Sequence, residues 1–116
     1  VDQVGFGNGS GVSQQGNDND SSVAQTGDIN SSSVLQQGNM NMSTVTQDGN
    51  FNFSDVKQIG DNNVSNVDQD GDFNSSGVIQ TGDDNDSDVD ALGKTEPFST
   101  IYTGAFLPAR LGSGEG

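Results

Sequence analysis

The stretch VTQDGNFNFSD, residues 45–55, places a glutamine two positions after its valine, and then a glycine, an asparagine and a serine at fixed distances. The next stretch, VKQIGDNNVSN at 56–66, has the same five residues at the same positions. The two stretches that precede residue 45, VAQTGDINSSS at 23–33 and VLQQGNMNMST at 34–44, match as well. A strict repeat indicates that every unit meets the same surroundings, as in proteins built from stacked repeats.

The period is 11 residues, and valine, glutamine, glycine, asparagine and serine each form an unbroken column through eight units. A ninth unit begins at Val89, but Ala91 replaces its glutamine. We therefore divide the chain into a repeat region, 1–93, and a non-repeat tail, 94–116. The residues expected to form ladders between units are Val12, Val23, Val34, Val45, Val56, Val67, Val78, Gln14, Gln25, Gln36, Gln47, Gln58, Gln69, Gln80, Asn19, Asn30, Asn41, Asn52, Asn63, Asn74 and Asn85.

The spacing within a unit favours strands over helices. A period of 11 also suits a right-handed helical supercoil, but one apolar column cannot form a helical stripe. An obligatory glycine would also cost about 1 kcal/mol per unit in a helix. By contrast, Ser10, Val12 and Gln14 alternate by two, as do residues on one face of a strand. We predict strands whose fixed residues point inward.

The glycine column predicts the arcs between strands, because glycine adopts positive φ without steric cost. These arc glycines are Gly16, Gly27, Gly38, Gly49, Gly60, Gly71 and Gly82. A coil of one unit would be too narrow without cross-links, and the chain has no cysteine. We therefore predict an all-β fold, a β-solenoid with two units per coil. Two parallel sheets would face each other at roughly 10 Å, with coils about 4.8 Å apart as in cross-β polymers.

Each column then has a physical role. Stacked glutamines and asparagines can form amide ladders along the axis, which satisfies polar groups whose burial would otherwise be costly. Valine supplies the dry contact between the sheets, and serine is small enough for the narrow interior. Odd and even units would form opposite sheets, one with an acidic outer face and the other with a more apolar one.

Composition excludes several classes of function. Only 28% of residues are hydrophobic and the net charge is −14, values that without a repeat would indicate disorder. Three basic against 17 acidic residues argue against nucleic acid and anionic membranes as partners. The absence of histidine and cysteine disfavours zinc and most other transition-metal sites, and leaves no nucleophile–base pair. We expect no enzyme and no cofactor.

The ends of a solenoid favour assembly. Their edge strands have unpaired backbone groups that monomeric proteins cap, whereas Val1 opens directly on a full repeat. Another copy with the same repeat would fit such an edge, and head-to-tail stacking that does not close yields a fibre. The expected partner is therefore a second copy of the chain.

The pattern Gln-x-Gly-x-x-Asn-x-Ser-x-Val-x-Gln resembles the repeat of the curlins, the subunits of bacterial curli amyloid fibres. The opening VDQVGFGNGSGVSQQG, residues 1–16, is especially similar. The resemblance covers the repeat region and implies an exported subunit that polymerises outside the cell into a fibre of the biofilm matrix. Further partners that the resemblance suggests are a nucleator or export machinery. Curlin repeats commonly have alanine where this chain has serine, and their two half-repeats are usually unequal, whereas here both follow one template.

Two further features leave alternatives open. Asp18, Asp20, Asp84 and Asp86 are weak candidates for calcium, which prefers closely spaced carboxylates; otherwise they form a charged surface that opposes wrong lateral pairing. A monomeric solenoid that binds ice, another surface or calcium is the alternative function. The outward columns are mixed, however, and lack the regular threonine array that suits ice.

In the tail, Pro97 is expected to end the solenoid because proline cannot donate to a sheet. Residues 98–107, FSTIYTGAFL, have strand-forming composition, and 112–116 are expected to be flexible. The tail either caps the solenoid or joins subunits. The candidate joint residues are Phe98, Ile101, Tyr102, Phe106 and Leu107.

Overall fold

The structure is a computed structural model that describes residues 1–92 in full and 97–103 and 108–113 by their backbone. The described residues form strands joined by short arcs, with no helix that could cross a membrane. The strands are β1 (Asp2–Val4), β2 (Gly9–Gln15), β3 (Asp20–Thr26), β4 (Ser31–Gln37), β5 (Met42–Asp48), β6 (Phe53–Ile59), β7 (Val64–Asp70), β8 (Ser75–Thr81), β9 (Asp86–Leu92), β10 (Pro97–Thr103) and β11 (Pro108–Ser113).

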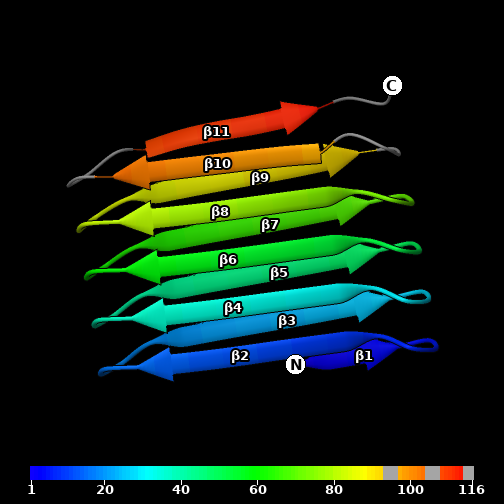
Figure 1. The fold of residues 1–116 in the computed structure, drawn as a ribbon, viewed down its shortest axis with the longest axis horizontal. Helices are drawn as coiled ribbons and strands as arrows, with labels where there is room; N and C mark the ends of the chain where they lie inside the picture. Colours follow the sequence, from blue (N-terminus) through cyan, green and yellow to red (C-terminus); the bar gives the residue numbers. More distant parts are fainter. Residues whose placement is uncertain (93–96, 104–107, 114–116) are drawn as a thin grey trace.

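Odd-numbered strands form one sheet and even-numbered strands the other, and all neighbours within each sheet are parallel (Figure 1). Each residue pairs with the one 22 positions later, so Val45 lies beside Val67, and Val34 beside Val56. One coil therefore contains two units. This confirms the prediction of a β-solenoid with two parallel sheets.

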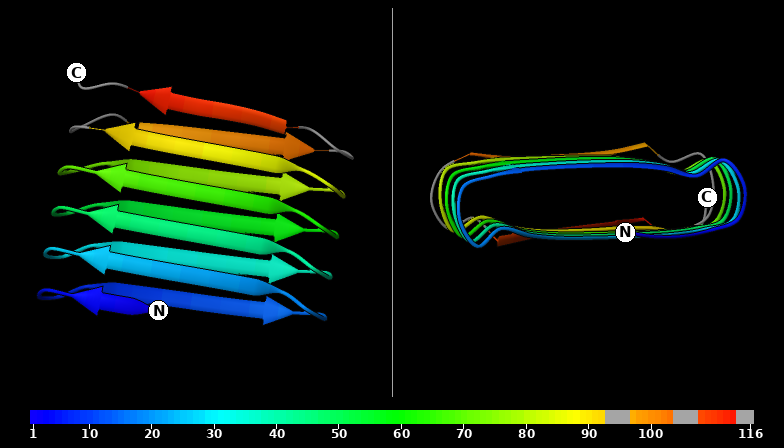
Figure 2. Two further views of the ribbon diagram at one scale, coloured as in Figure 1. Left: turned by 180° about the vertical axis from the view of Figure 1, so that it is seen from behind. Right: turned by 90° about the horizontal axis from the view of Figure 1, so that it is seen from below.

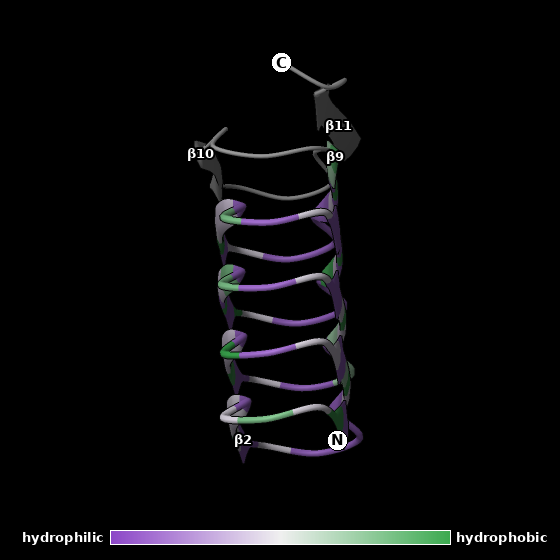
Figure 3. Ribbon diagram, turned by 90° about the vertical axis from the view of Figure 1, so that its right-hand side faces the viewer, coloured by the Kyte–Doolittle hydropathy of each residue, from purple (hydrophilic) through white to green (hydrophobic). Residues whose placement is uncertain are grey.

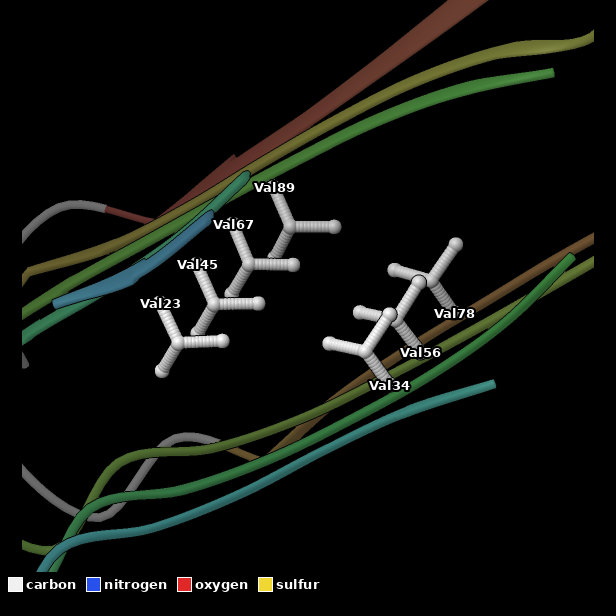
Figure 4. Packing of buried hydrophobic residues seen from close by; sticks show 7 residues of the cluster. All are labelled: Val23, Val34, Val45, Val56, Val67, Val78 and Val89. Atoms are coloured by element: carbon white, nitrogen blue, oxygen red, sulfur yellow. The ribbon is translucent and has the colours of Figure 1, made fainter. Parts of the chain in front are cut away.

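The coils superpose into one flattened outline when viewed along the stack (Figure 2, right), and the described chain measures 34 × 26 × 12 Å. Its apolar core is a single line of valines from each sheet. Val23, Val45, Val67 and Val89 face Val34, Val56 and Val78 across the interior (Figure 4), and each is at most 1% exposed. Buried glutamine, asparagine and serine outnumber them, so hydrogen bonding must stabilise most of this interior.

The arc glycines have two separate reasons to be glycine. Their φ angles lie between 104° and 123°, a region closed to other residues. In addition, a Cβ at Gly16, Gly27, Gly38, Gly49 or Gly60 would lie only 1.8–2.1 Å from the carbonyl oxygen of the glycine one coil later. The arcs thus stack with backbone directly on backbone, which the spacing of the sequence alone does not reveal.

Strands continue in both sheets beyond the repeat region. β10 pairs in register with β8, and β11 with β9. Pro97, expected to end the solenoid, is instead the first residue of β10, and Pro108 begins β11. This is the strand position where proline is tolerated. The expected strand 98–107 therefore overlaps β10, and residues 112–113 belong to β11; positions 104–107 and 114–116 lie outside the described residues.

Replacing an arc glycine by alanine tests this stacking. Gly60→Ala should lower the free energy of unfolding by at least about 1–3 kcal/mol from backbone strain alone, because φ is 123° and Gly82 blocks the Cβ. Gly77→Ala is the control, since no atom lies within 4 Å of its Cβ position. It should leave stability unchanged or raised. Urea unfolding of the soluble chain measures both, and equal losses would contradict the close arc packing.

Candidate functional site

The buried glutamines form two continuous ladders. Gln3, Gln25, Gln47 and Gln69 stack in one sheet, and Gln14, Gln36, Gln58 and Gln80 in the other. Each Nε2 donates to the Oε1 of the next glutamine over 2.6–2.9 Å. All donors therefore point toward the C-terminal end of the stack, and the ladder has a direction. Ala91 occupies the next position after Gln69, so this ladder lacks its side-chain acceptor there.

From Gln25 to Gln80, the second amide hydrogen of each ladder glutamine ties the two sheets together. Gln25 donates to the carbonyl of Gly9 at 3.0 Å, and Gln58 to that of Met42 at 2.9 Å. These acceptors are the first residues of strands in the opposite sheet, just before a column serine. The small serine leaves room for the glutamine that reaches across. The serine hydroxyls, by contrast, are buried without a partner among the described residues, and nothing in the structure explains the hydroxyl itself.

The asparagine column closes the arcs. The Nδ2 of Asn30 donates to the carbonyl of Gly49 in the next coil at 2.9 Å, and its Oδ1 accepts the backbone N–H of Asn52 at 2.9 Å. Equivalent bonds recur along the stack. Direct amide–amide bonds between column asparagines are seen in the even-to-odd arcs of the described chain, as between Asn63 and Asn41 at 3.1 Å. Asparagine therefore bonds mainly to backbone, whereas the sequence led us to expect a ladder of side chains.

A further ladder was missed by the sequence analysis. The residue after each arc glycine uses its Oδ1 to accept the backbone N–H of the equivalent residue one coil earlier, over 2.7–3.1 Å. The acceptors are Asp28, Asn39, Asn50, Asp61, Asp72 and Asp83. The signal was present, because seven of the eight residues in this column are Asp or Asn. The side chains of this column therefore help to hold successive coils together.

The next arc position is left-handed in every unit, with φ of 56–62° at the non-glycine residues. The arcs after even strands mostly use residues that tolerate this conformation, such as Asp18 and Asn62. The arcs after odd strands instead contain Ile29, Phe51 and Phe73, which are 47–56% exposed. Phe51 and Phe73 stack with ring centroids 5.0 Å apart. Figure 3 shows hydrophobic colour recurring in the arcs on this edge of the solenoid.

The two outer faces differ in charge. The outward side of β3, β5, β7 and β9, here called the acidic face, has seven aspartates: Asp20, Asp48, Asp68, Asp70, Asp86, Asp88 and Asp90. The outward side of β2, β4, β6 and β8, the neutral face, has only Asp55 and Lys57 as charged residues. On the acidic face, partial burial and then the charges of Asp90, Asp70, Asp88 and Asp48 raise the pKa of Asp68 above its ordinary value of 3.8.

The calcium candidates fall into two separate pairs. Asp18 and Asp20 flank the start of β3, whereas Asp84 and Asp86 flank the start of β9, three coils further along. In the part of the chain that the structure describes, no group of three or more acidic residues is placed to hold a metal ion. No pocket is found among those residues either.

The candidate joint residues lie at or beyond the end of the fully described region. Phe98, Ile101 and Tyr102 belong to β10, where their backbones pair with Ser76, Ile79 and Gln80. Tyr102 thus takes the glutamine position, and Thr100 the valine position. Phe106 and Leu107 lie outside the described residues.

Comparison with known protein families matches the curlin associated repeat to residues 1–27, 22–49, 44–71 and 60–93. These matches cover the whole repeat region. The chain belongs to the curlin repeat family. Searches of curated proteins and of solved structures find no match. The curlin repeat family is structural rather than enzymatic, which directs attention to the ladders and outer faces of the solenoid.

Breaking one rung of a glutamine ladder should be costly. Gln58→Leu removes the acceptor of Gln36 and the donor to Gln80. At about 1–3 kcal/mol for each buried group left unpaired, unfolding free energy should fall by about 2–6 kcal/mol. Gln37→Leu is the control, because Gln37 is exposed and makes only a 3.5 Å contact with Gln15. Similar urea midpoints for the two variants would argue against the ladder as a source of stability.

The acidic face should make stability depend on pH. Because the pKa of Asp68 is higher in the folded chain, the folded state binds more protons between that pKa and 3.8. The contribution of Asp68 to the free energy of unfolding therefore falls as pH rises through this window. Asp68→Asn should raise thermal stability at pH 7 but not at pH 3. Asp55→Asn, on the neutral face, is the control. An equal gain at both pH values would rule out the charge effect.

Proposed function

We propose that this chain is a structural subunit that polymerises head to tail into an extracellular cross-β fibre. The observation that carries the proposal is the in-register pairing of like residues every 22 positions. A coil from another molecule offers the same glutamines, asparagines and arc glycines. It can therefore form the bonds that successive coils form within one chain.

The direction of the glutamine ladders supports head-to-tail addition. Each Nε2 donates to the Oε1 of the glutamine one coil later, as from Gln14 to Gln36 and from Gln36 to Gln58. Repeat coils stacked in the same direction place donors against acceptors, whereas coils stacked in opposite directions would place like groups together.

Membership of the curlin repeat family supports the biological setting. It favours secretion through export machinery, growth from a nucleating partner, and a role in the biofilm matrix and in adhesion. The interior is built of repeated structural contacts and contains no histidine or cysteine, which suits a scaffold. The joint residues Phe98, Ile101 and Tyr102 would then lie where one subunit meets the next.

Electron microscopy of the purified chain at micromolar concentration tests the proposal. We expect long unbranched fibres with diffraction spacings of about 4.8 Å along the axis and about 10 Å across it. Gly60→Ala should prevent them, since it blocks arc stacking, whereas Gly77→Ala should not. Persistent monodisperse particles of the unmodified chain would contradict a polymerising function.

A further inference from the structure

The neutral face contains glycines that the subunit itself does not require. Gly9 and Gly11 lie in β2 and Gly77 in β8, and no atom lies within 4 Å of the Cβ position of any of them. None has a positive φ. Glycine inside a strand costs roughly 0.5–1 kcal/mol relative to alanine, and it often marks a place where another chain approaches closely.

Small and large residues are segregated on this face. One and three positions before the column valine, β2, β4 and β8 have only glycine or serine. We call this half the furrow: Gly9, Gly11, Ser31, Ser33, Ser75 and Gly77. One and three positions after the valine the residues are larger, apart from one serine, and we call this half the ridge: Ser13, Gln15, Leu35, Gln37, Ile79 and Thr81. Leu35 is 36% and Ile79 41% exposed.

We propose that the neutral face is a self-complementary interface, through which two parallel solenoids of this protein pair about a two-fold axis along the fibre. Such an axis reverses the strand direction, so a residue one position after the valine faces the residue one position before it in the partner. Leu35 then faces Ser33, and Ile79 faces Gly77. The ridge of each copy enters the furrow of the other.

Charge follows the same symmetry. β6 is the one fully described neutral-face strand without small residues before its valine, and there Asp55 and Lys57 take the two facing positions. The two-fold axis places Asp55 of each copy against Lys57 of the other, giving two reciprocal ion pairs. Phe53, which is 48% exposed, faces Ile59. The register of β10 continues the pattern, because Ile101 follows Ile79 and Ser99 follows Gly77.

The neutral face of one subunit is too small to hold two chains together, so pairing requires the polymer. This inference therefore rests on the proposed function. Four seven-residue strands cover about 19 by 23 Å, or roughly 450 Å², which is below the ~800 Å² per partner of a stable interface. Isolated chains should therefore remain unpaired. Along a fibre the same contact recurs in every subunit, and the contributions add as in multivalent binding. The acidic faces then point outward and oppose further bundling.

Filling the furrow tests the proposal against a merely adhesive surface. Ser33→Phe adds apolar area but fills the space that Leu35 of the other copy would occupy. The two solenoids should then separate, and the mass per length of the fibres should fall twofold. Ser22→Phe is the matched control, since Ser22 is also exposed and precedes its valine by one position, but lies on the acidic face. Scanning transmission electron microscopy measures mass per length, and Ser22→Phe fibres should match the unmodified chain.

A charge exchange provides a second test that leaves the apolar surface intact. Lys57→Asp should halve the mass per length, because aspartates then face aspartates. The double variant D55K/K57D restores opposite charges across the two-fold axis and should restore paired fibres. The pairing alone would be overturned if fibres of the unmodified chain had the mass per length of one solenoid. It would also be overturned if S33F and K57D both left the mass per length unchanged. Absence of fibres from the unmodified chain would overturn the proposed function as well.

Discussion

A buried glutamine amide needs two donor bonds and an acceptor bond, and in this thin solenoid it finds them at only two places. One is the opposite sheet, where Gln58 reaches the carbonyl of Met42; the other is the coils before and after, where it meets Gln36 and Gln80. This requirement fixes the register, because a slip of one residue would point the glutamines outward. Since leaving such an amide unpaired costs about 1–3 kcal/mol, each coil must present the same residues as its neighbours.

The arcs impose the same rule through the backbone. The arc glycines from Gly16 to Gly60 lie against the carbonyl of the glycine one coil later, so any larger residue there would separate the coils. The asparagine amides and the Asp or Asn side chains after the glycines then bond across the same gap. Amide ladders and arcs thus demand the same coil spacing along the whole stack. A coil from a second molecule satisfies that demand as well as one from the same chain, which is why the proposed fibre needs no new kind of contact.

The outward residues are free of these constraints, and here the two sheets diverge. One face has seven aspartates, and there partial burial, followed by the charges of neighbouring aspartates, raises the pKa of Asp68. The other face is nearly uncharged, and in β2, β4 and β8 it has glycine or serine before the column valine and mostly larger residues after it. In the proposed fibre, growth along the axis would depend on the inward columns that the two sheets share, whereas lateral contacts would depend on the outward columns that differ. This separation would favour polymerisation in one direction and restrict association in the others.

The sequence by itself determined the architecture. An unbroken 11-residue period with alternating Ser, Val and Gln is compatible with strands and not with a helical stripe, and like residues must stack if every unit has the same surroundings. Only the tertiary structure decided what depends on contacts between coils. It showed that the asparagines bond mainly to backbone, that the Asp and Asn residues after the glycines form another ladder, and that left-handed arc positions accommodate Ile29, Phe51 and Phe73. It also showed that Pro97 begins a strand. Periodicity identifies which residues are equivalent, but which atoms meet 22 residues apart depends on the path of the arcs in space.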